Sequence, residues 1–185
     1  MTKPALASAA APLTIRDSLD SDLAAIQRIY AHHVLTGLGS FEEAPPAADE
    51  MQRRRAEILS HALPYLVCEL DGRIAGYAYA GRFRTRSAYR YSVEDSIYVA
   101  PDAQRRGIGR RLLDQLILRC TKQGYRQMIA VIGDSANHGS IGVHLAAGFA
   151  EVAKLPAIGF KFGRWVDCVM MQRPLGPGQS TLPDR

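Results

Sequence analysis

The chain has 185 residues, of which 47% are hydrophobic and 22% are charged. This length allows one domain with a substantial core and is too short for two ordinary domains, and the composition is normal for a globular protein. The formal net charge of +5 comes mostly from arginine, which permits an anionic ligand. No run of residues is long and apolar enough to span a membrane.

The three cysteines, Cys68, Cys120 and Cys168, are far apart in the sequence and odd in number. Their spacing matches no zinc-binding pattern, so we expect no metal site. Each lies in an apolar segment, as buried free thiols in a reducing compartment do. The cysteines therefore indicate a cytoplasmic protein.

The two ends of the chain differ in composition from its middle. The Ala-rich start is interrupted by Pro4 and Ser8, so we interpret it as a disordered leader rather than a signal peptide. The last residues are rich in proline and glycine. We expect a leader over 1–12, a single domain over 13–173 and a flexible tail over 174–185.

The first half of the chain has the apolar periods of one strand, two helices and a strand pair. Asp20 or Ser21 can cap the first helix, and Asp71-Gly72 is a typical hairpin turn between the paired strands. The long loop 36–46 contains two glycines and two prolines, and its length favours a binding role. The strands are expected at 13–16, 65–70 and 73–82, and the helices over the apolar face from Leu23 to Val34 and over 49–61.

The second half predicts a strand, a helix, a strand, a helix and two further strands. Gly124 and Gly148 lie where the two helices would end. The resulting order, βααβββαβαββ, predicts one α/β (α+β) domain with a mixed sheet and helices on both of its faces. The strands are expected at 91–99, 127–132, 149–154 and 164–172, and the helices at 110–123 and 137–147.

A basic, glycine-containing segment, Gln104-Arg105-Arg106-Gly107-Ile108-Gly109, connects the strand that ends at Val99 to the helix that follows. Unpaired backbone N–H groups and the positive end of a helix converge at such a junction. Glycine lets the backbone approach a ligand without a Cβ in the way. The segment therefore predicts a ligand that carries phosphate groups.

Known phosphate-binding motifs narrow the choice of ligand. The chain contains no P-loop sequence, and a dinucleotide fingerprint would need a third glycine where Leu112 stands. The pattern Gln-x-x-Gly-x-Gly instead resembles the acyl-CoA loop of the GNAT N-acetyltransferase superfamily. The order of elements over about Thr14–Arg173 is similar to that of the same superfamily.

Five further segments resemble the phosphinothricin acetyltransferase group of this superfamily. That group includes enzymes that acetylate methionine sulfone and methionine sulfoximine. The segments are Phe41-Glu42, 86–89, 94–99, 130–133 and 159–167.

The resemblance implies a GNAT-type fold, with a largely antiparallel central sheet that splays between its fourth and fifth strands. It also implies acetyl-CoA as the acyl donor and a homodimer. The pantetheine arm would pair with the strand backbone, and the loop would hold the pyrophosphate with N–H groups and arginines. Asn137 and Ser140 match family positions that contact CoA, and can also cap a helix. The expected donor-binding residues are Ile97, Tyr98, Val99, Gln104, Arg105, Arg106, Gly107, Ile108, Gly109, Arg110, Asn137 and Ser140.

Acyl transfer to an amine needs a base, because an ammonium group has no lone pair. Glu94 lies in an otherwise apolar strand and matches the general base of the family; burial would raise its pKa toward the working range. An ion pair at a strand edge is the structural alternative. The adjacent Asp95 should point to the opposite face of a regular strand.

His144 is the second candidate catalytic residue. It follows Asn137 by seven residues, where many members of the superfamily have a tyrosine that protonates the leaving thiolate. The phosphinothricin group has histidine at this position. The sequence leaves His144 open as proton donor, assisting base or structural contact.

A small zwitterionic acceptor would need a clamp for its carboxylate. Arg86 and Tyr89 fit this role, with Phe41 and Glu42 as a lid and Lys161 as part of the wall. The nearby arginines, Arg82, Arg84, Arg86 and Arg90, favour an anionic acceptor.

The sequence therefore predicts acetyl transfer from acetyl-CoA to the amine of a small amino acid or analogue, by direct attack in a ternary complex. Acetylation of a protein N-terminus or a polyamine is the alternative within the same class, and the acidic pair Glu42-Glu43 would suit it. A non-catalytic CoA-binding or nucleic-acid-binding module is the alternative from another class. No helix-turn-helix or aromatic-basic RNA pattern supports nucleic-acid binding.

Overall fold

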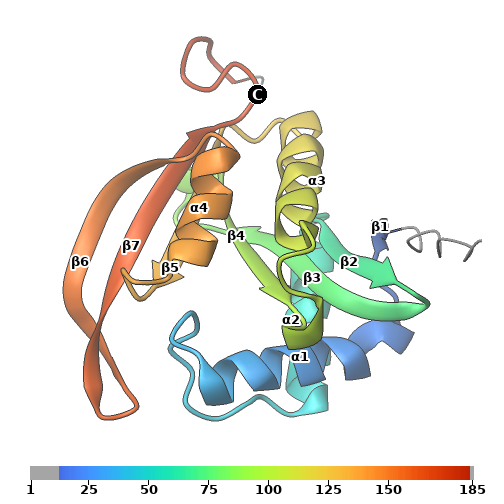
Figure 1. Ribbon diagram of the computed structural model, residues 1–185. Helices are drawn as coiled ribbons and strands as arrows, with labels where there is room; N and C mark the ends of the chain where they lie inside the picture. The colour runs from blue at the N-terminus through green and yellow to red at the C-terminus, as the bar shows by residue number, and fades with distance from the viewer. Residues whose placement is uncertain (1–12, 184–185) are drawn as a thin grey trace, which may run out of the picture.

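The computed structural model describes residues 13–183, so the predicted leader lies outside the described residues. Seven strands form one sheet in the order β1-β2-β3-β4-β5-β7-β6 (Figure 1). Within the described residues, β4 and β5 are the one parallel pair. The predicted mixed, largely antiparallel sheet is confirmed. The strands are β1 Thr14–Asp17, β2 Tyr65–Leu70, β3 Arg73–Arg82, β4 Ser92–Val99, β5 Gln127–Gly133, β6 Ala150–Lys161 and β7 Arg164–Pro174.

Within residues 13–183, four α-helices cover the two faces of this sheet, as predicted (Figure 1). Three short 3-10 helices precede or connect the main elements: η1 Asp20–Asp22, η2 Ser87–Tyr89 and η3 Pro101–Ala103. The helices are α1 Leu23–Thr36, α2 Ala48–Ser60, α3 Ile108–Lys122 and α4 His138–Ala146.

Each face of the sheet has its own kind of packing. On the face of α3, Leu112 is fully buried, and a Cβ added at Gly76 would lie 3.0 Å from Ile108 Cγ2; the glycine therefore lets the helix lie close to β3. On the face of α1, Tyr77 of β3 stacks on Tyr98 of β4 with ring centroids 5.1 Å apart, and Tyr30 of α1 meets Tyr98 edge-on at 4.9 Å. The two faces of the sheet are therefore packed against helices.

The pairing of β4 with β5 is short. It runs from Ser92 opposite Gln127 to Asp95 opposite Ala130. Both strands continue, β4 to Val99 and β5 to Gly133, without pairing with each other. The predicted splay is therefore present and begins directly after Asp95. Unpaired backbone on the inner side of the splay is available to a ligand.

The last hairpin differs from the prediction. β6 extends to Lys161, whereas a strand was expected only to residue 154. Pro156 and Gly159 suggested a break, because both residues weaken a strand interior. The structure accommodates them at the edge of the sheet with a register shift between Leu155 and Gly159. The resulting β6–β7 hairpin is long and curved (Figure 1).

Candidate active site

The loop between β4 and α3 has the geometry of an anion site. Arg105 and Gly107 both adopt positive φ angles, 59° and 75°, and Gly107 is the N-cap of α3. The helix begins at Ile108, two residues earlier than predicted. The first helical bond runs from Arg111 N–H to the Gly107 carbonyl, so the preceding N–H groups lack partners within the helix. They open onto the loop, where phosphate oxygens can accept from them.

A groove of about 710 Å³ extends from this loop into the splay between β4 and β5. Its other walls come from α4, the end of α1 and residues 36–39. A ligand with a charged head and a long narrow arm fits a groove of this shape. All of the predicted donor-binding residues except Arg106 line it: Ile97, Tyr98, Val99, Gln104, Arg105, Gly107, Ile108, Gly109, Arg110, Asn137 and Ser140.

Arg110 ties the two helices beside the groove together. Its Nε donates to Asp114 Oδ1 at 2.9 Å, and its Nη1 donates to the Ala146 carbonyl at 2.7 Å. The guanidinium group is therefore held in place before any ligand binds.

Asn137 and Ser140 combine the two roles that the sequence allowed for them. Asn137 Oδ1 accepts from the Ser140 N–H at 3.2 Å and caps α4. Both residues also line the groove. The positive end of α4 therefore faces the same space as that of α3.

Glu94 is half-buried on β4. Burial raises the pKa of Glu94, the charge of Asp95 adds to this, and Arg84 opposes it. Ser96, two residues further along the strand, lines the groove. Residues i and i+2 point to the same face of a strand, so Glu94 lies on the face of Ser96, one position before the residues that line the groove; Glu94 itself does not line it.

Asp95 points to the opposite face of β4, as expected, and binds His144 of α4. His144 Nε2 lies 2.9 Å from Asp95 Oδ2, and the two side chains are only 4% and 2% exposed. His144 Nδ1 donates to the Ser140 carbonyl at 2.8 Å. Both side chains line the groove near the start of the splay.

The buried contact shifts the pKa of the histidine. Burial alone lowers the pKa of His144, but the hydrogen bond and charge of Asp95, with the Ser140 carbonyl, outweigh it and raise the pKa. Sequence reasoning found His144 and did not assign a role to Asp95. One signal in the sequence could have indicated a role for Asp95: it is a second acidic residue, directly after Glu94 and just before the expected splay.

The loop 36–46 folds over the far side of the splay. The Phe41 ring lies against Gly159 of β6, so closely that a Cβ at Gly159 would overlap it. Glu42 forms an ion pair with Arg54 of α2 at 2.6 Å. Neither predicted lid residue lines the donor groove. Glu42 instead holds the loop against α2.

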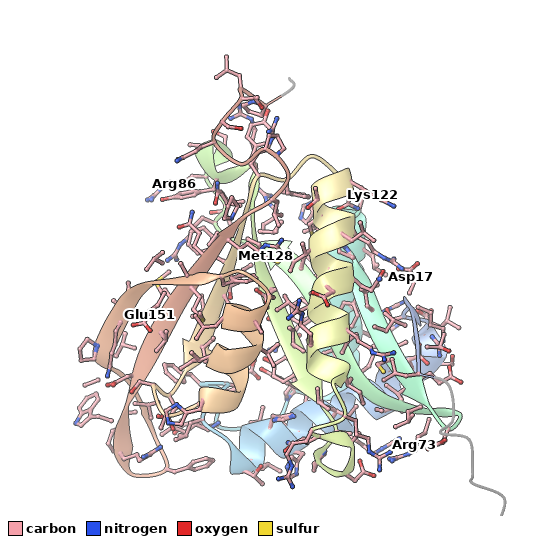
Figure 2. All side chains as sticks on the ribbon, turned by 45° about the horizontal axis from the view of Figure 1, so that its top comes forward. Asp17, Arg73, Arg86, Lys122, Met128 and Glu151 are labelled. Carbon is pink, nitrogen blue, oxygen red and sulfur yellow. The ribbon has the colours of Figure 1, made fainter. Side chains whose placement is uncertain are left out.

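Arg86 and Tyr89 lie in and beside η2, before β4. Both side chains are exposed, and the Tyr89 ring packs edge-on against Phe83. Figure 2 shows Arg86 near the end of the sheet opposite to Arg73. The two residues are therefore separate from the donor groove and are free to contact another molecule.

Lys161 differs from the expectation that it forms part of a substrate wall. It is only 1% exposed, and its Nζ donates to the carbonyls of Gly37 at 2.9 Å and Ser40 at 2.7 Å. Burial lowers the pKa of Lys161. Because β6 extends to this residue, its ammonium group reaches behind the loop and anchors it.

His33 is a groove residue that sequence reasoning missed. Its Nε2 donates to the Val99 carbonyl at 2.8 Å, and burial lowers its pKa. Since it lies 66 residues from Val99 in the chain, no local pattern marks it. The neutral ring fixes the end of α1 beside the outer part of β4.

Residues 13–183 contain no group of three or more His, Cys, Asp or Glu side chains that could hold a metal ion. No helix in this range is long and apolar enough to cross a membrane. The three cysteines are free thiols and buried.

A sheet that splays beside a glycine-containing loop, with helix starts facing the opening, defines the class of CoA-dependent acyltransferases. Residues 15–170 match the acetyltransferase (GNAT) domain. The chain belongs to this family, and it is an acetyl-CoA-dependent N-acetyltransferase.

The relatives confirm the resemblance to the phosphinothricin group. The chain is 56% identical to a phosphinothricin N-acetyltransferase of Alcaligenes faecalis, over 92% of this chain and 87% of the relative. It is 38% identical to an L-methionine sulfoximine/L-methionine sulfone acetyltransferase of Salmonella typhimurium, over 88% and 95%. A Sinorhizobium meliloti phosphinothricin acetyltransferase in complex with AcCoA superposes with a TM-score of 0.91 at 48% identity, covering 94% of each chain.

Proposed function

We propose that this enzyme transfers the acetyl group of acetyl-CoA to the amine of a small amino acid or analogue of the phosphinothricin, methionine sulfone or methionine sulfoximine type. The observation that carries this proposal is the groove along the splay of β4 and β5, which begins one residue after Glu94, a half-buried carboxylate with a raised pKa. The acceptors named for the relatives support it.

The chain's own groups account for the acyl transfer. Bound acetyl-CoA supplies the thioester carbonyl that an amine attacks. The loop before α3 and the N-terminal starts of α3 and α4 hold the phosphates. The unpaired edges of β4 and β5 align the pantetheine arm. Glu94 accepts a proton from the acceptor's ammonium group and so frees the attacking lone pair.

The state of the thiols supports direct attack in a ternary complex. Cys68, Cys120 and Cys168 are all buried, and none of them lines the groove. Burial raises the pKa of Cys120 to about 12, so this thiol stays protonated and is a poor nucleophile. No described cysteine is placed to carry the acetyl group.

The acceptor would bind on the Glu94 face, beneath the loop that carries Phe41. Arg86 and Tyr89 are exposed and can bind a carboxylate at the mouth. A run of neighbouring arginines makes this mouth cationic, which favours an anionic acceptor over a polyamine. Glu42, the acid that would suit a polyamine, is already paired with Arg54.

The test is release of free thiol from acetyl-CoA with a panel of acceptors. The panel includes phosphinothricin, methionine sulfone, methionine sulfoximine, common amino acids, spermidine and a peptide with a free N-terminus. We expect the highest kcat/KM with one of the first three compounds. Preference for spermidine or the peptide would support the alternative acceptors, and no thiol release with any amine would contradict the enzymatic function.

The β6–β7 hairpin supports a homodimer. Exposed apolar patches are usually small on the surface of a monomer, whereas this hairpin exposes six large apolar side chains. The Phe160 and Trp165 rings pack edge-on at 5.2 Å, and Trp165 is 68% exposed. A second copy of the chain would cover them. The exposed apolar residues of the hairpin are Val152, Leu155, Ile158, Phe160, Phe162 and Trp165.

The cytoplasm is the compartment in which we expect the enzyme to act. The three buried free thiols suit a reducing environment, and acetyl-CoA is used there. Fractionation of cells that express the full chain would test this expectation.

A further inference from the structure

Val131 is exposed although it belongs to a central strand. β5 lies between β4 and β7 in the sheet. The flanking residues Ala130 and Ile132 are almost fully buried, whereas 41% of Val131 is exposed. Burial of an apolar side chain of this size is favourable, and the chain itself does not provide it here. Val131 therefore marks a part of the sheet that the chain leaves open on one face.

The register of the strands places Val131 on the same face as Glu94. Glu94 is paired with Ile129 in the parallel pairing of β4 with β5, and residues paired in this way point to the same side of a sheet. Val131 follows Ile129 by two residues and so points to that side as well. The pairing ends at Asp95 opposite Ala130. Val131 therefore lies directly past the last pair, where the two strands separate.

Phe41 and Met170 bound this face on the side away from Glu94. Met170 of β7 is half-buried and lies directly opposite Val131 in the antiparallel register. Gly133 follows Val131 by two residues, and a Cβ added there would lie 3.0 Å from Phe41 Cε1, so the ring covers this position. Four residues of β5, about 13 Å of strand, separate the partner of Glu94 from Gly133. The acyl group and the amine must meet within this length.

Val131 also lies where the donor groove reaches this face. It lines the groove, as does Ser96 on the same face of β4. Glu94, Met170 and Phe41 do not line it. The groove therefore opens onto the Glu94 face between the Ser96 and Val131 side chains. A thioester whose carbonyl carbon meets an amine there has its acyl substituent beside the methyl groups of Val131.

We propose that Val131 is a specificity-determining residue that limits the acyl donor to acetyl-CoA. This inference rests on the proposed function and adds to it the class of acyl group that the site accepts. An acetyl group has one methyl beyond its carbonyl, whereas propionyl and butyryl groups have one and two further carbons to place. The Val131 methyl groups, with Met170 beside them and the Phe41 ring further along β5, occupy the space that these carbons would need.

The chemical step has the same balance for every acyl group. The nitrogen lone pair forms the C–N bond, the C–S bond breaks, and its electron pair stays on sulfur. The ammonium group loses two protons, the first of them to Glu94; one proton ends on sulfur and the other in solvent. One ammonium and one thioester thus give one amide, one thiol and one proton. The length of the acyl chain therefore changes its fit in the site and not the chemistry.

The first test compares three donors. kcat/KM is measured for acetyl-, propionyl- and butyryl-CoA at a saturating concentration of the best acceptor. In the unmodified enzyme, we expect propionyl-CoA to be used at least about 10-fold less well than acetyl-CoA, because one methylene in an apolar site discriminates by this factor or more. Val131→Ala removes two methyl groups and should reduce this discrimination by about 10-fold. Val131→Ile keeps a β-branched residue in the strand, adds one carbon and should increase it. Equal donor ratios in the three proteins would overturn the inference.

Val143→Ala is the matched control. Val143 of α4 also lines the groove, and its substitution removes the same two methyl groups. However, α4 packs on the opposite face of β4, where His144 contacts Asp95. Whatever the rates of this variant are, the ratio between its donors should equal that of the unmodified enzyme. A loss of discrimination as large as that in Val131→Ala would show that any widening of the groove is sufficient, and would contradict the role of Val131.

Binding without an acceptor separates this inference from the proposed function. Calorimetry gives the Kd of acetyl-CoA and of butyryl-CoA for each protein without turnover. Val131→Ala should bind butyryl-CoA at least about 10-fold more tightly than the unmodified chain does, and acetyl-CoA equally well. An unchanged Kd ratio together with a changed KM for the acceptor would place Val131 against the acceptor and overturn the inference. If the unmodified chain acetylates no amine, the proposed function fails, whereas the Kd ratios still decide whether Val131 meets the acyl group.

Discussion

Glu94 and Asp95 are neighbours in the chain, yet their environments differ. Strand geometry sends the two side chains to opposite faces of β4. Glu94 is half-buried, and burial raises its pKa. Asp95 is fully buried and bound to His144. Two adjacent carboxylates therefore differ in setting: one is half-buried and is the proposed base, and the other is buried in a contact with a histidine.

Glu94→Gln tests the base directly. The amide cannot accept a proton from an ammonium group, so kcat at neutral pH should fall by about 10²- to 10⁴-fold. Binding of acetyl-CoA, measured by calorimetry, should be preserved, because the groove residues are unchanged. Glu57→Gln on the exposed side of α2 is the control. Full activity in Glu94→Gln would remove Glu94 from the mechanism.

The raised pKa of Glu94 also predicts a pH dependence. Below its folded-state pKa the carboxyl is protonated and cannot act as a base, so kcat/KM should rise with pH through that value. Because burial places this pKa above that of an ordinary glutamate, the rising limb should lie above about pH 4.3. The initial rate with the best acceptor, measured across the acidic range, checks the position of the limb. A limb at the pKa of an exposed glutamate would contradict the burial argument.

At the scale of elements, the donor site depends on where α3 starts. Gly107 has a φ of 75° and Arg105 a φ of 59°, so two residues of the loop adopt the left-handed conformation directly before the helix. A side chain at Gly107 would meet no atom within 4 Å. Any cost of substitution there comes from backbone conformation and not from crowding.

Gly107→Ala should therefore weaken CoA binding without unfolding the protein. The left-handed conformation costs an L-residue roughly 1–2 kcal/mol, which corresponds to about a 5- to 30-fold higher Kd for CoA if the loop relaxes in the free protein. Gly142→Ala is the matched control. Gly142 lies in α4 with open space around it and no positive φ, so its substitution should leave Kd unchanged. Equal Kd values for all three proteins would contradict the role of the loop conformation.

The loop 36–46 is a second element whose position depends on one side chain. Lys161→Met should remove two hydrogen bonds from a buried ammonium group to the Gly37 and Ser40 carbonyls. We expect the free energy of unfolding to fall by about 2 kcal/mol, measured by denaturant titration, together with a higher KM for the acceptor. Lys154→Met on the same strand removes only an exposed ion pair with Asp167 and should cost at most about 1 kcal/mol. Similar losses in both variants would contradict the anchoring role.

Much of this element-level arrangement was predictable from the sequence. Apolar periodicity gave the order of strands and helices, and the resemblance implied the splay. The end of β6 was missed because Pro156 and Gly159 suggest a turn, while an edge strand tolerates both. The Asp95–His144 contact joins residues 49 positions apart, so no local pattern contains it. Lys161 was misplaced for the same reason, since its partners lie more than 120 residues away.

At the scale of the whole molecule, the β6–β7 hairpin carries the surface that we propose for dimerisation. It carries exposed aromatic side chains, including Trp165 and Phe160, and it lies at the edge of the sheet (Figure 1). The same hairpin supplies Gly159, against which the lid residue Phe41 packs. Dimerisation through this surface would therefore stiffen the acceptor side of the site.

Trp165→Ser tests this assembly. Loss of a large apolar side chain from the centre of an interface should shift the enzyme toward monomer, as measured by sedimentation velocity over a range of concentrations. The KM for the acceptor should rise more than the KM for acetyl-CoA. Leu19→Ser is the control, because Leu19 is similarly exposed but precedes η1, far along the chain from the hairpin. A monomer at all concentrations in the unmodified protein would contradict the dimer.

The alternation of side chains at Glu94 and Asp95 has a consequence for how such an enzyme can diversify. The starts of α3 and α4 line the donor groove, whereas η2 and the last hairpin, on the proposed acceptor side, do not line it. Substitutions in the second set can accumulate without altering the first. Such substitutions can change which acceptor is preferred while the affinity for acetyl-CoA stays the same. The acceptor preference of this chain is therefore expected to depend on residues that do not bind the donor.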